Sequence, residues 1–149
     1  MNDQLERLYR EHLTEFRRVA SAIAGNVDLG RDAVQDAFAR AVRSHDRFRG
    51  DGTLEAWVWR IVVNAARDAR RRASSETADL WSPAGESSAA EVPLQSLTAR
   101  QREIVFLHYF ADLSYDEIAS ALGISPGTVG ATLTAARRTL RVSLEEVRT

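Results

Sequence analysis

Residues 114–129 read SYDEIASALGISPGTV and carry the signals of two helices joined by a short turn. Ser114 and Glu117 match the Ser-x-x-Glu capping box, which opens a helix by satisfying its first free N–H groups. Gly123 lies where that helix must stop, because glycine takes the left-handed turn conformation at little cost. Ser125 then caps a second helix, with Pro126 at its first position. The stretch therefore predicts a helix-turn-helix whose second helix enters a DNA major groove, and a helical hairpin used only for packing is the alternative.

The rest of the chain shows helical periodicity and no alternation typical of strands, so the sequence predicts an all-α fold. Thr53 and Thr98 are expected N-caps, and Gly25 to Gly30 is expected to form a turn. Further helices are expected over residues 3–24, 31–45, 54 to about 72 and 98 to about 111, and the second helix of the helix-turn-helix is expected to continue through Leu144.

Residues 74–93 lack this periodicity and are rich in Ser, Ala and acidic residues. Pro83, Gly85 and Pro93 add to a composition that predicts a flexible linker. Trp81 is unusual there, because a large aromatic side chain is rarely left free, so it is expected to dock on a module or a partner. The sequence thus predicts two small helical domains, residues 1–73 and residues 94–149, joined by this linker.

Composition narrows the class of protein. The 149 residues include no cysteine, which excludes disulfides and thiolate metal sites. No apolar run reaches the length of a membrane span and no signal peptide is evident, so we expect a soluble cytoplasmic protein. Fourteen arginines against eleven acidic residues leave residues 1–75 positive, whereas residues 76–91 carry four acidic residues and no base.

Three ordered stretches together resemble the bacterial alternative sigma factors of the extracytoplasmic-function (ECF) group of the sigma-70 family. They are DAVQDAF at 32–38; DRFRGDGTLEAW at 46–57 with RIVVN at 60–64; and LTARQRE at 97–103 with LSYDEIA at 113–119 and GTV at 127–129. They are similar to sigma regions 2.2, 2.3 with 2.4, and 4, respectively. The resemblance covers nearly all of the chain except the linker.

The resemblance implies that the first domain binds the β′ clamp helices of core RNA polymerase. The matching residues are Asp32, Gln35, Asp36 and Phe38. An acidic and amide face beside an apolar patch suits a basic partner helix, although an ordinary solvated face fits the same residues. The family also implies contact of the second domain with the polymerase β flap, control by an anti-sigma factor, and a monomer when free.

The resemblance also implies recognition and opening of the −10 promoter element. The expected contacts are Phe48, Arg49, Arg60, Asn64, Arg67, Arg70 and Arg71. An aromatic ring can stack on a flipped base, an amide can bond its edge, and arginines can bind phosphates. Phe48 as a core residue and Asn64 as a buried cap are the alternatives. Trp57 is expected in the core, and Trp59, on another face, is a candidate for DNA or partner contact.

The expected −35 recognition helix departs from the family pattern. The family's candidate contacts fall on Ser125, Thr128, Thr132, Thr134, Arg137 and Arg138. Family members tend to place basic or bulky polar residues soon after Thr-Val, but this chain has no charge from Gly130 until Arg137. Because base edges are usually read by Arg, Lys, Asn or Gln, we expect weak or relaxed −35 recognition. Ser125 and Thr128 are expected to meet phosphates at the helix N-terminus.

An enzyme interpretation finds little support. His12, His45 and His108 lie in separate elements and outside any catalytic or metal-binding motif, so we expect no catalytic residue, metal or cofactor. The remaining alternatives are a plain helix-turn-helix transcriptional regulator and a sigma-like protein that binds partners without initiating transcription. Binding to core polymerase distinguishes the sigma factor from the plain regulator.

Overall fold

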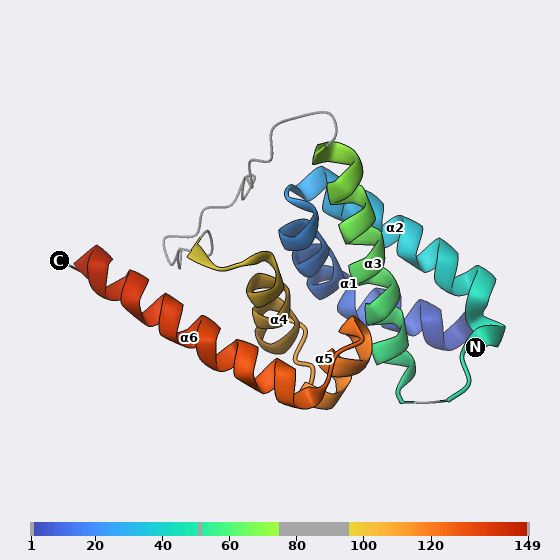
Figure 1. The fold of residues 1–149 in the computed structure, drawn as a ribbon. Helices are drawn as coiled ribbons and strands as arrows, with labels where there is room; N and C mark the ends of the chain where they lie inside the picture. The colour runs from blue at the N-terminus through green and yellow to red at the C-terminus, as the bar shows by residue number, and fades with distance from the viewer. Residues whose placement is uncertain (1, 51, 75–95, 149) are drawn as a thin grey trace.

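The computed structural model describes residues 2–50, 52–74 and 96–148, and its regular secondary structure within these ranges is entirely helical (Figure 1). Its elements are α1 (Asn2–Ala24), α2 (Val27–Ser44), the short 3-10 helix η1 (His45–Arg47), α3 (Leu54–Ser74), α4 (Ala99–Tyr109), α5 (Tyr115–Leu122) and α6 (Pro126–Arg148). The all-α prediction is confirmed. The predicted linker apart from Ser74, together with Trp81, lies outside the described residues.

The expected caps are present in the structure. Thr98 and Ser114 each form a complete capping box, with Gln101 and Glu117 respectively. The Thr53 hydroxyl accepts a hydrogen bond from the backbone N–H of Ala56 at 3.1 Å. Gly123 ends α5 with a φ of 70°, the left-handed conformation that the sequence required there. These local signals therefore position the helix-turn-helix formed by α5 and α6.

The start of α2 was predicted wrongly. The helix begins at Val27, four residues earlier than expected, because Asn26 acts as its N-cap and accepts a hydrogen bond from the N–H of Leu29. Gly30 consequently lies inside the helix and not in a turn. A Cβ at Gly30 would lie 2.5 Å from the backbone of Ser21 in α1. Glycine is therefore needed there for the close approach of the two helices, and not for a turn.

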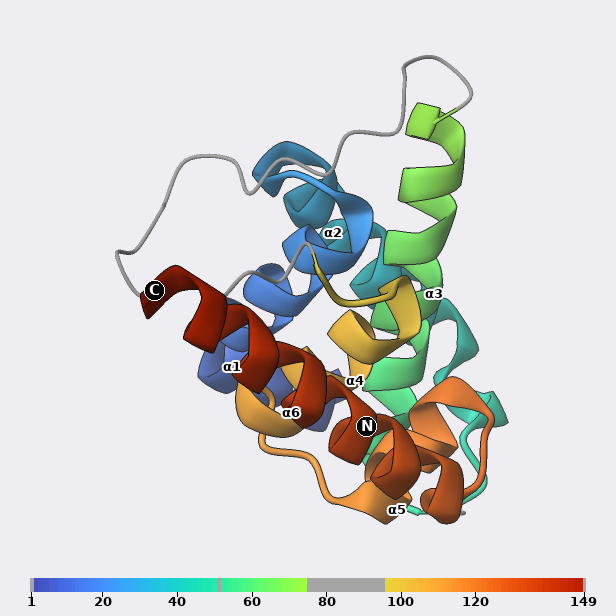
Figure 2. The same ribbon diagram turned by 60° about the vertical axis from the view of Figure 1, so that its left-hand side comes forward.

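Helices α1, α2 and α3 pack against one another and form the N-terminal module (residues 2–74). Helices α4, α5 and α6 form the C-terminal module (residues 96–148), in which α6 packs on both α4 and α5. The two modules also contact each other, since α3 packs on α5 and α1 packs on α4. Figures 1 and 2 show α4 and α5 beside the N-terminal bundle from two directions.

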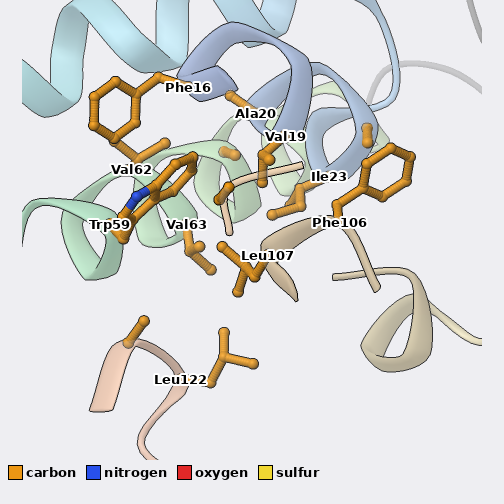
Figure 3. Close-up of a cluster of buried hydrophobic side chains, with 14 of the residues drawn as sticks. Phe16, Val19, Ala20, Ile23, Trp59, Val62, Val63, Phe106, Leu107 and Leu122 are labelled. Carbon is orange, nitrogen blue, oxygen red and sulfur yellow. The ribbon is translucent and has the colours of Figure 1, made fainter. Parts of the chain in front are cut away.

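One continuous apolar cluster crosses from the N-terminal to the C-terminal module (Figure 3). Trp59 of α3 is fully buried in it, with its ring centroid 4.4 Å from that of Phe16. Leu107 of α4 and Leu122 of α5 enter the same cluster from the C-terminal module. The expectation that Trp59 is available to DNA or a partner is therefore wrong. Trp57, expected in the core, is only half-buried.

Candidate nucleic-acid and protein interfaces

The outer face of α2 presents the acidic and amide residues singled out from the sequence. Asp32 and Gln35 are exposed, and the Gln35 amide lies 3.4 Å from the hydroxyl of Tyr9. Asp36 is half-buried and bonds Arg40 at 2.8 Å, and Arg40 also reaches Asp68 of α3 at 3.5 Å. Helix α2 therefore offers a partner an acidic surface that is held in place by α1 and α3.

Phe38, the fourth residue expected at this surface, lies in the core. Its exposed fraction is 9%, and its ring meets those of Tyr9 and Phe16 edge to face, at centroid distances of 5.0 and 5.3 Å. This packing leaves little of Phe38 for direct contact with another protein.

A hollow of about 410 Å³ lies between α2 and α3, next to this acidic face. Asp32 and Asp36 line one side and Arg72 lines the other, over a floor of small and apolar side chains. Arg72 makes interactions within the chain. The hollow thus combines apolar surface with both signs of charge beside the acidic face of α2.

The loop before α3 holds the first of the residues expected at the −10 element. Phe48 is half-buried and its ring centroid lies 5.6 Å from that of Trp57. Gly50 and Gly52 both have positive φ values, so the loop turns sharply at two points. Arg49 is exposed. Phe48 thus contacts Trp57 but is not fully buried, so its ring is partly accessible to solvent.

Outward-facing polar residues form a stripe along α3. Arg60, Asn64, Arg67 and Arg71 recur at intervals of three or four residues, which places them on one side of a helix. Arg60 and Asn64 are exposed. Arg71 is exposed and bonds Asp68 at 3.3 Å, and Arg70 is half-buried and also has interactions within the chain. Asn64 is therefore not a buried cap, and its amide is available to another molecule.

Arg67 differs from its neighbours in the stripe because it contacts the C-terminal module. Its Nε donates to Oε2 of Glu103 in α4 at 3.3 Å, and its Nη2 donates to Oε1 of the same carboxylate. Glu103 is only 7% exposed. Arg100 adds a second positive charge, 3.8 Å from Glu103. The structure thus pairs one candidate DNA contact, the half-buried Arg67, with a buried carboxylate of the other module.

The start of α6 is built as the sequence indicated. The Ser125 hydroxyl accepts from the N–H of Thr128 at 3.1 Å and lies 2.9 Å from the Thr128 hydroxyl. Thr132 and Thr134 each donate the hydroxyl hydrogen to the backbone carbonyl four residues earlier, at 2.7 and 3.0 Å. Since those hydrogens are already used within the helix, these two side chains offer other molecules a methyl group and an acceptor.

Arg137 is held by two tyrosines that the sequence analysis did not single out. Its Nε donates to the hydroxyl of Tyr109 at 2.9 Å, and the guanidinium lies 5.9 Å from the centre of that ring. This hydrogen bond, with a smaller contribution from Tyr115, raises the pKa of Arg137 above its ordinary value. Arg138, the next residue, is exposed. No sequence motif indicated the contact with Tyr109, because Tyr109 lies 28 residues before Arg137 in the chain.

Gly130 in the recognition helix also has a tertiary explanation. A Cβ at this position would lie 3.3 Å from the ring of Tyr115, which is tighter than ordinary van der Waals contact. Tyr115 itself is 38% exposed. The absence of a side chain at Gly130 therefore lets the Tyr115 ring lie close against α6.

His108 is half-buried at the end of α4, and its Nδ1 lies 3.1 Å from the carbonyl of Leu113. Within the described ranges, no cluster of three or more His, Asp and Glu side chains is arranged to hold a metal ion. Across those ranges, none of the helices combines the length and the hydropathy that a membrane span requires.

Comparisons with known proteins agree with this division into two modules. Residues 8–76 match the family model for sigma-70 region 2, and residues 94–140 match that for sigma-70 region 4. Together these two ranges span most of the chain. The N-terminal and C-terminal modules thus correspond to the two conserved regions that define this class of transcription initiation subunit.

Similar proteins indicate which group of sigma factors this chain resembles. The chain is 30% identical to the ECF RNA polymerase sigma factor SigM of Mycobacterium tuberculosis over 145 residues, covering 91% of this chain and 74% of that protein. It is 31% identical to the ECF sigma-E factor of Escherichia coli, covering 83% of this chain and 78% of that protein. The chain belongs to the ECF sigma factors of the sigma-70 family, as its motifs suggested, and is an alternative sigma factor that directs transcription.

A solved structure shares the arrangement of both modules. CnrH, in complex with the cytosolic domain of CnrY, superposes with a TM-score of 0.76 at 26% identity, covering 98% of this chain and 90% of that one. The similarity extends over α1 to α6, since nearly the whole chain is aligned. The packing of the C-terminal module on the N-terminal module therefore has a counterpart in a homologous protein.

Proposed function

We propose that this chain binds core RNA polymerase through the acidic face of α2 and opens promoter DNA with the stripe on α3. Asp32, Gln35 and Asp36 suit a basic helix such as the β′ clamp helices. The catalytic work of RNA synthesis remains with the polymerase, and the chain supplies no catalytic residue, metal or cofactor. It acts in the cytoplasm, where the polymerase works.

The observation that carries the proposal is the stripe of Arg60, Asn64 and Arg71 on α3, beside the Phe48 loop. The exposed guanidinium of Arg60 suits a phosphate, the free amide of Asn64 suits a base edge, and the partly accessible Phe48 ring suits stacking. Single-stranded DNA is bound by this combination of charge and aromatic surface. Arg49, in the loop before α3, and Arg70, near the end of α3, add positive charge.

The recognition helix α6 is expected to contribute less sequence information. Its N-terminus, with Ser125 and Thr128, suits a phosphate, because free N–H groups and the helix dipole favour an anion. Thr132 and Thr134 can offer methyl groups to thymine, whereas direct readout of other bases normally needs longer polar side chains. Arg137 and Arg138 add charge further along α6. We therefore expect relaxed −35 recognition, and contact of the C-terminal module with the β flap.

An anti-sigma factor is the expected regulator. CnrH, whose fold this chain shares, was solved in complex with the cytosolic domain of CnrY. A monomeric chain held by such a protein would be kept from the polymerase until a signal releases it. The alternative of a sigma-like protein that only sequesters partners remains testable by the same experiment.

Run-off transcription with purified core polymerase tests the proposal. The template is a promoter library varied independently at −10 and −35, assayed with and without this protein. Specific initiation that requires the protein and the −10 element would support it, and scrambling −35 should reduce initiation only weakly. Core binding without initiation would indicate a sequestering protein, and the absence of core binding would indicate a plain DNA-binding regulator.

A further inference from the structure

Ion pairs join the acidic face of α2 to the polar stripe of α3. Nη2 of Arg40 lies 2.8 Å from Oδ2 of Asp36, one turn earlier in α2, and Nη1 lies 3.5 Å from Oδ2 of Asp68 in α3. The other oxygen of Asp68, Oδ1, lies 3.3 Å from Nη2 of Arg71. Acidic and basic groups therefore alternate along a row of four residues. The row begins at the surface proposed for polymerase and ends at the surface proposed for DNA.

Arg40 uses the two ends of its guanidinium for two different helices. The guanidinium is a planar fork of fixed geometry, so one end can hold Asp36 while the other holds Asp68. All three side chains are only partly exposed, at 35% for Arg40 and 40% for each carboxylate. Water therefore screens these attractions less than it screens those of a fully exposed pair. Asp36 and Asp68 thus compete for the charge of one arginine.

This competition affects the carboxylate that a basic partner would meet on α2. A positive side chain of the polymerase binds Asp36 more weakly when Arg40 already neutralises it. If Asp68 lost its charge, Arg40 would keep only Asp36 of these two partners and would neutralise it more fully. Arg72 lines the far side of the hollow next to Asp36 and contributes to the same field whether or not Asp68 is charged. Asp68 therefore controls how negative Asp36 appears to a partner, without lying on the outer face of α2.

The same carboxylate limits the positive charge that α3 presents to DNA. Residues 60–72 include five arginines, and Asp68 is their only acidic residue. The Arg71 side chain is 77% exposed, so a phosphate can approach it from solvent. Because phosphate and carboxylate are both negative, Asp68 repels that phosphate and offsets part of the charge of Arg71. Asp68 thus opposes DNA binding at one end of the row while it draws Arg40 from Asp36 at the other end.

We propose that Asp68 is a positioning residue that serves both surfaces through its two arginine partners. By holding Arg40 it keeps the Asp36 carboxylate available to the polymerase. By holding Arg71 it withholds positive charge from DNA, so that the chain alone binds DNA less strongly than its arginines would allow. The proposal rests on the function proposed above, because it assigns Asp36 to the polymerase and Arg71 to DNA.

Asp68→Asn removes the charge and keeps the shape, and it should change the two binding reactions in opposite directions. Affinity for core polymerase should fall about threefold, the scale set by partly exposed ion pairs. Affinity of the full chain for a single-stranded −10 oligonucleotide should rise by about the same factor. Its salt dependence should steepen by about 0.7 in the slope of log affinity against log salt, because one more phosphate is neutralised. Fluorescence anisotropy measures both affinities.

Glu6→Gln is the matched control, because it neutralises a carboxylate that pairs with Arg10 four residues away on the exposed side of α1. Both affinities should stay at the wild-type value in this variant. Circular dichroism checks that each variant keeps its helix content. Local damage to α3 would lower both affinities of Asp68→Asn together, so a parallel loss, or no change in either affinity, would overturn the proposal.

A double-mutant cycle tests whether Asp68 acts on polymerase binding through Arg40. Arg40→Gln removes the competitor, so affinity for core polymerase should rise about threefold. Adding Asp68→Asn to this variant should have no further effect on polymerase binding. The same loss in both backgrounds would mean that Asp68 acts independently of Arg40, and the proposal would be wrong. Arg40→Met, of similar length, provides a second background if Arg40→Gln does not fold.

A measurement without any partner separates this proposal from the proposed function. Nitrogen-15 NMR of arginine side chains reports how fast each guanidinium rotates, and an ion pair slows that rotation. Rotation of Arg40 and Arg71 should be faster in Asp68→Asn than in the wild type, and unchanged in Glu6→Gln. Unchanged rotation of both arginines in Asp68→Asn would overturn the role given to Asp68. If the wild type neither binds core polymerase nor initiates transcription, the proposed function fails, while the NMR result still decides whether Asp68 holds the two arginines.

Discussion

Helices α3 and α6 are both long, at 21 and 23 residues, and both carry candidate DNA contacts, but they are built differently. The outward face of α3 bears several arginines and the free amide of Asn64. The corresponding part of α6 has no charge before Arg137, and its threonine hydroxyls donate to its own backbone. From this contrast we expect the N-terminal module to supply more of the binding energy for DNA than the C-terminal module.

The buried faces of the two helices differ as well. Helix α6 buries a narrow stripe of Val129, Leu133 and Ala136 against its own module. Helix α3 is covered on more than one side, by α1 and α2 and by α5 of the other module. A helix held on several sides presents its remaining polar stripe rigidly, which favours positioned contacts of the kind that base recognition requires.

The largest expected effect tests the packing of α3. Trp59→Ala should lower the free energy of unfolding by about 3–5 kcal/mol, because it leaves a large cavity in the cluster shared by both modules. Trp57→Ala, at a half-buried position two residues earlier, should cost about 1 kcal/mol. Urea denaturation followed by circular dichroism measures both. Equal losses would contradict the assignment of Trp59 as the central core residue.

The second prediction compares the polar residues of the two helices. Asn64→Ala should cost about 1–3 kcal/mol at the −10 element, or about ten- to hundredfold in initiation, because it removes an amide that can bond a base edge. Thr132→Ala in α6 should change initiation by less than about threefold. Both are measured by run-off transcription on the same promoter. A comparable loss in Thr132→Ala would show that α6 reads DNA more strongly than its side chains suggest.

A gain of function sharpens the same comparison. Ala131 is exposed on α6 near the helix start, and Ala131→Arg supplies the kind of side chain that reads guanine. We expect dependence on the −35 sequence to rise about tenfold in the promoter library, with the preferred −35 bases shifted toward guanine. Arg141→Ala, which alters charge further along the helix, is the control. An unchanged −35 profile would mean that position 131 does not face the bases.

The smallest expected effect concerns Gly130. Alanine is favoured over glycine within a helix by about 1 kcal/mol. Part of this gain is lost because the new Cβ crowds the Tyr115 ring, which is exposed enough to yield. We therefore expect Gly130→Ala to stabilise the chain by less than about 1 kcal/mol, measured by thermal unfolding. The full gain should appear in a Tyr115→Ala background, and a destabilised Gly130→Ala variant would show that the ring cannot move.

The sequence by itself determined the helices, most of their ends and the order of the two modules. Thr53, Thr98, Ser114 and Gly123 act on backbone groups within a few residues, so their effects are independent of the rest of the fold. The motifs at 32–38 and 113–119 likewise span only a few neighbouring residues each, and they contributed to the family assignment. The missed start of α2 is the exception, because Gly30 resembles a turn residue until the neighbouring Ser21 is known.

Only the tertiary structure decided which side chains remain available. A prediction from periodicity assumes that a helix has one buried stripe. It placed Trp59 on the surface, whereas α3 packs against helices of both modules and is buried on more than one side. For the same reason, the sequence did not show that Phe38 is buried against Tyr9 or that Tyr109 bonds Arg137. It also did not show that Arg67 pairs with Glu103, 36 residues away. Such contacts join residues that no local pattern relates, so they are set only when distant elements pack together.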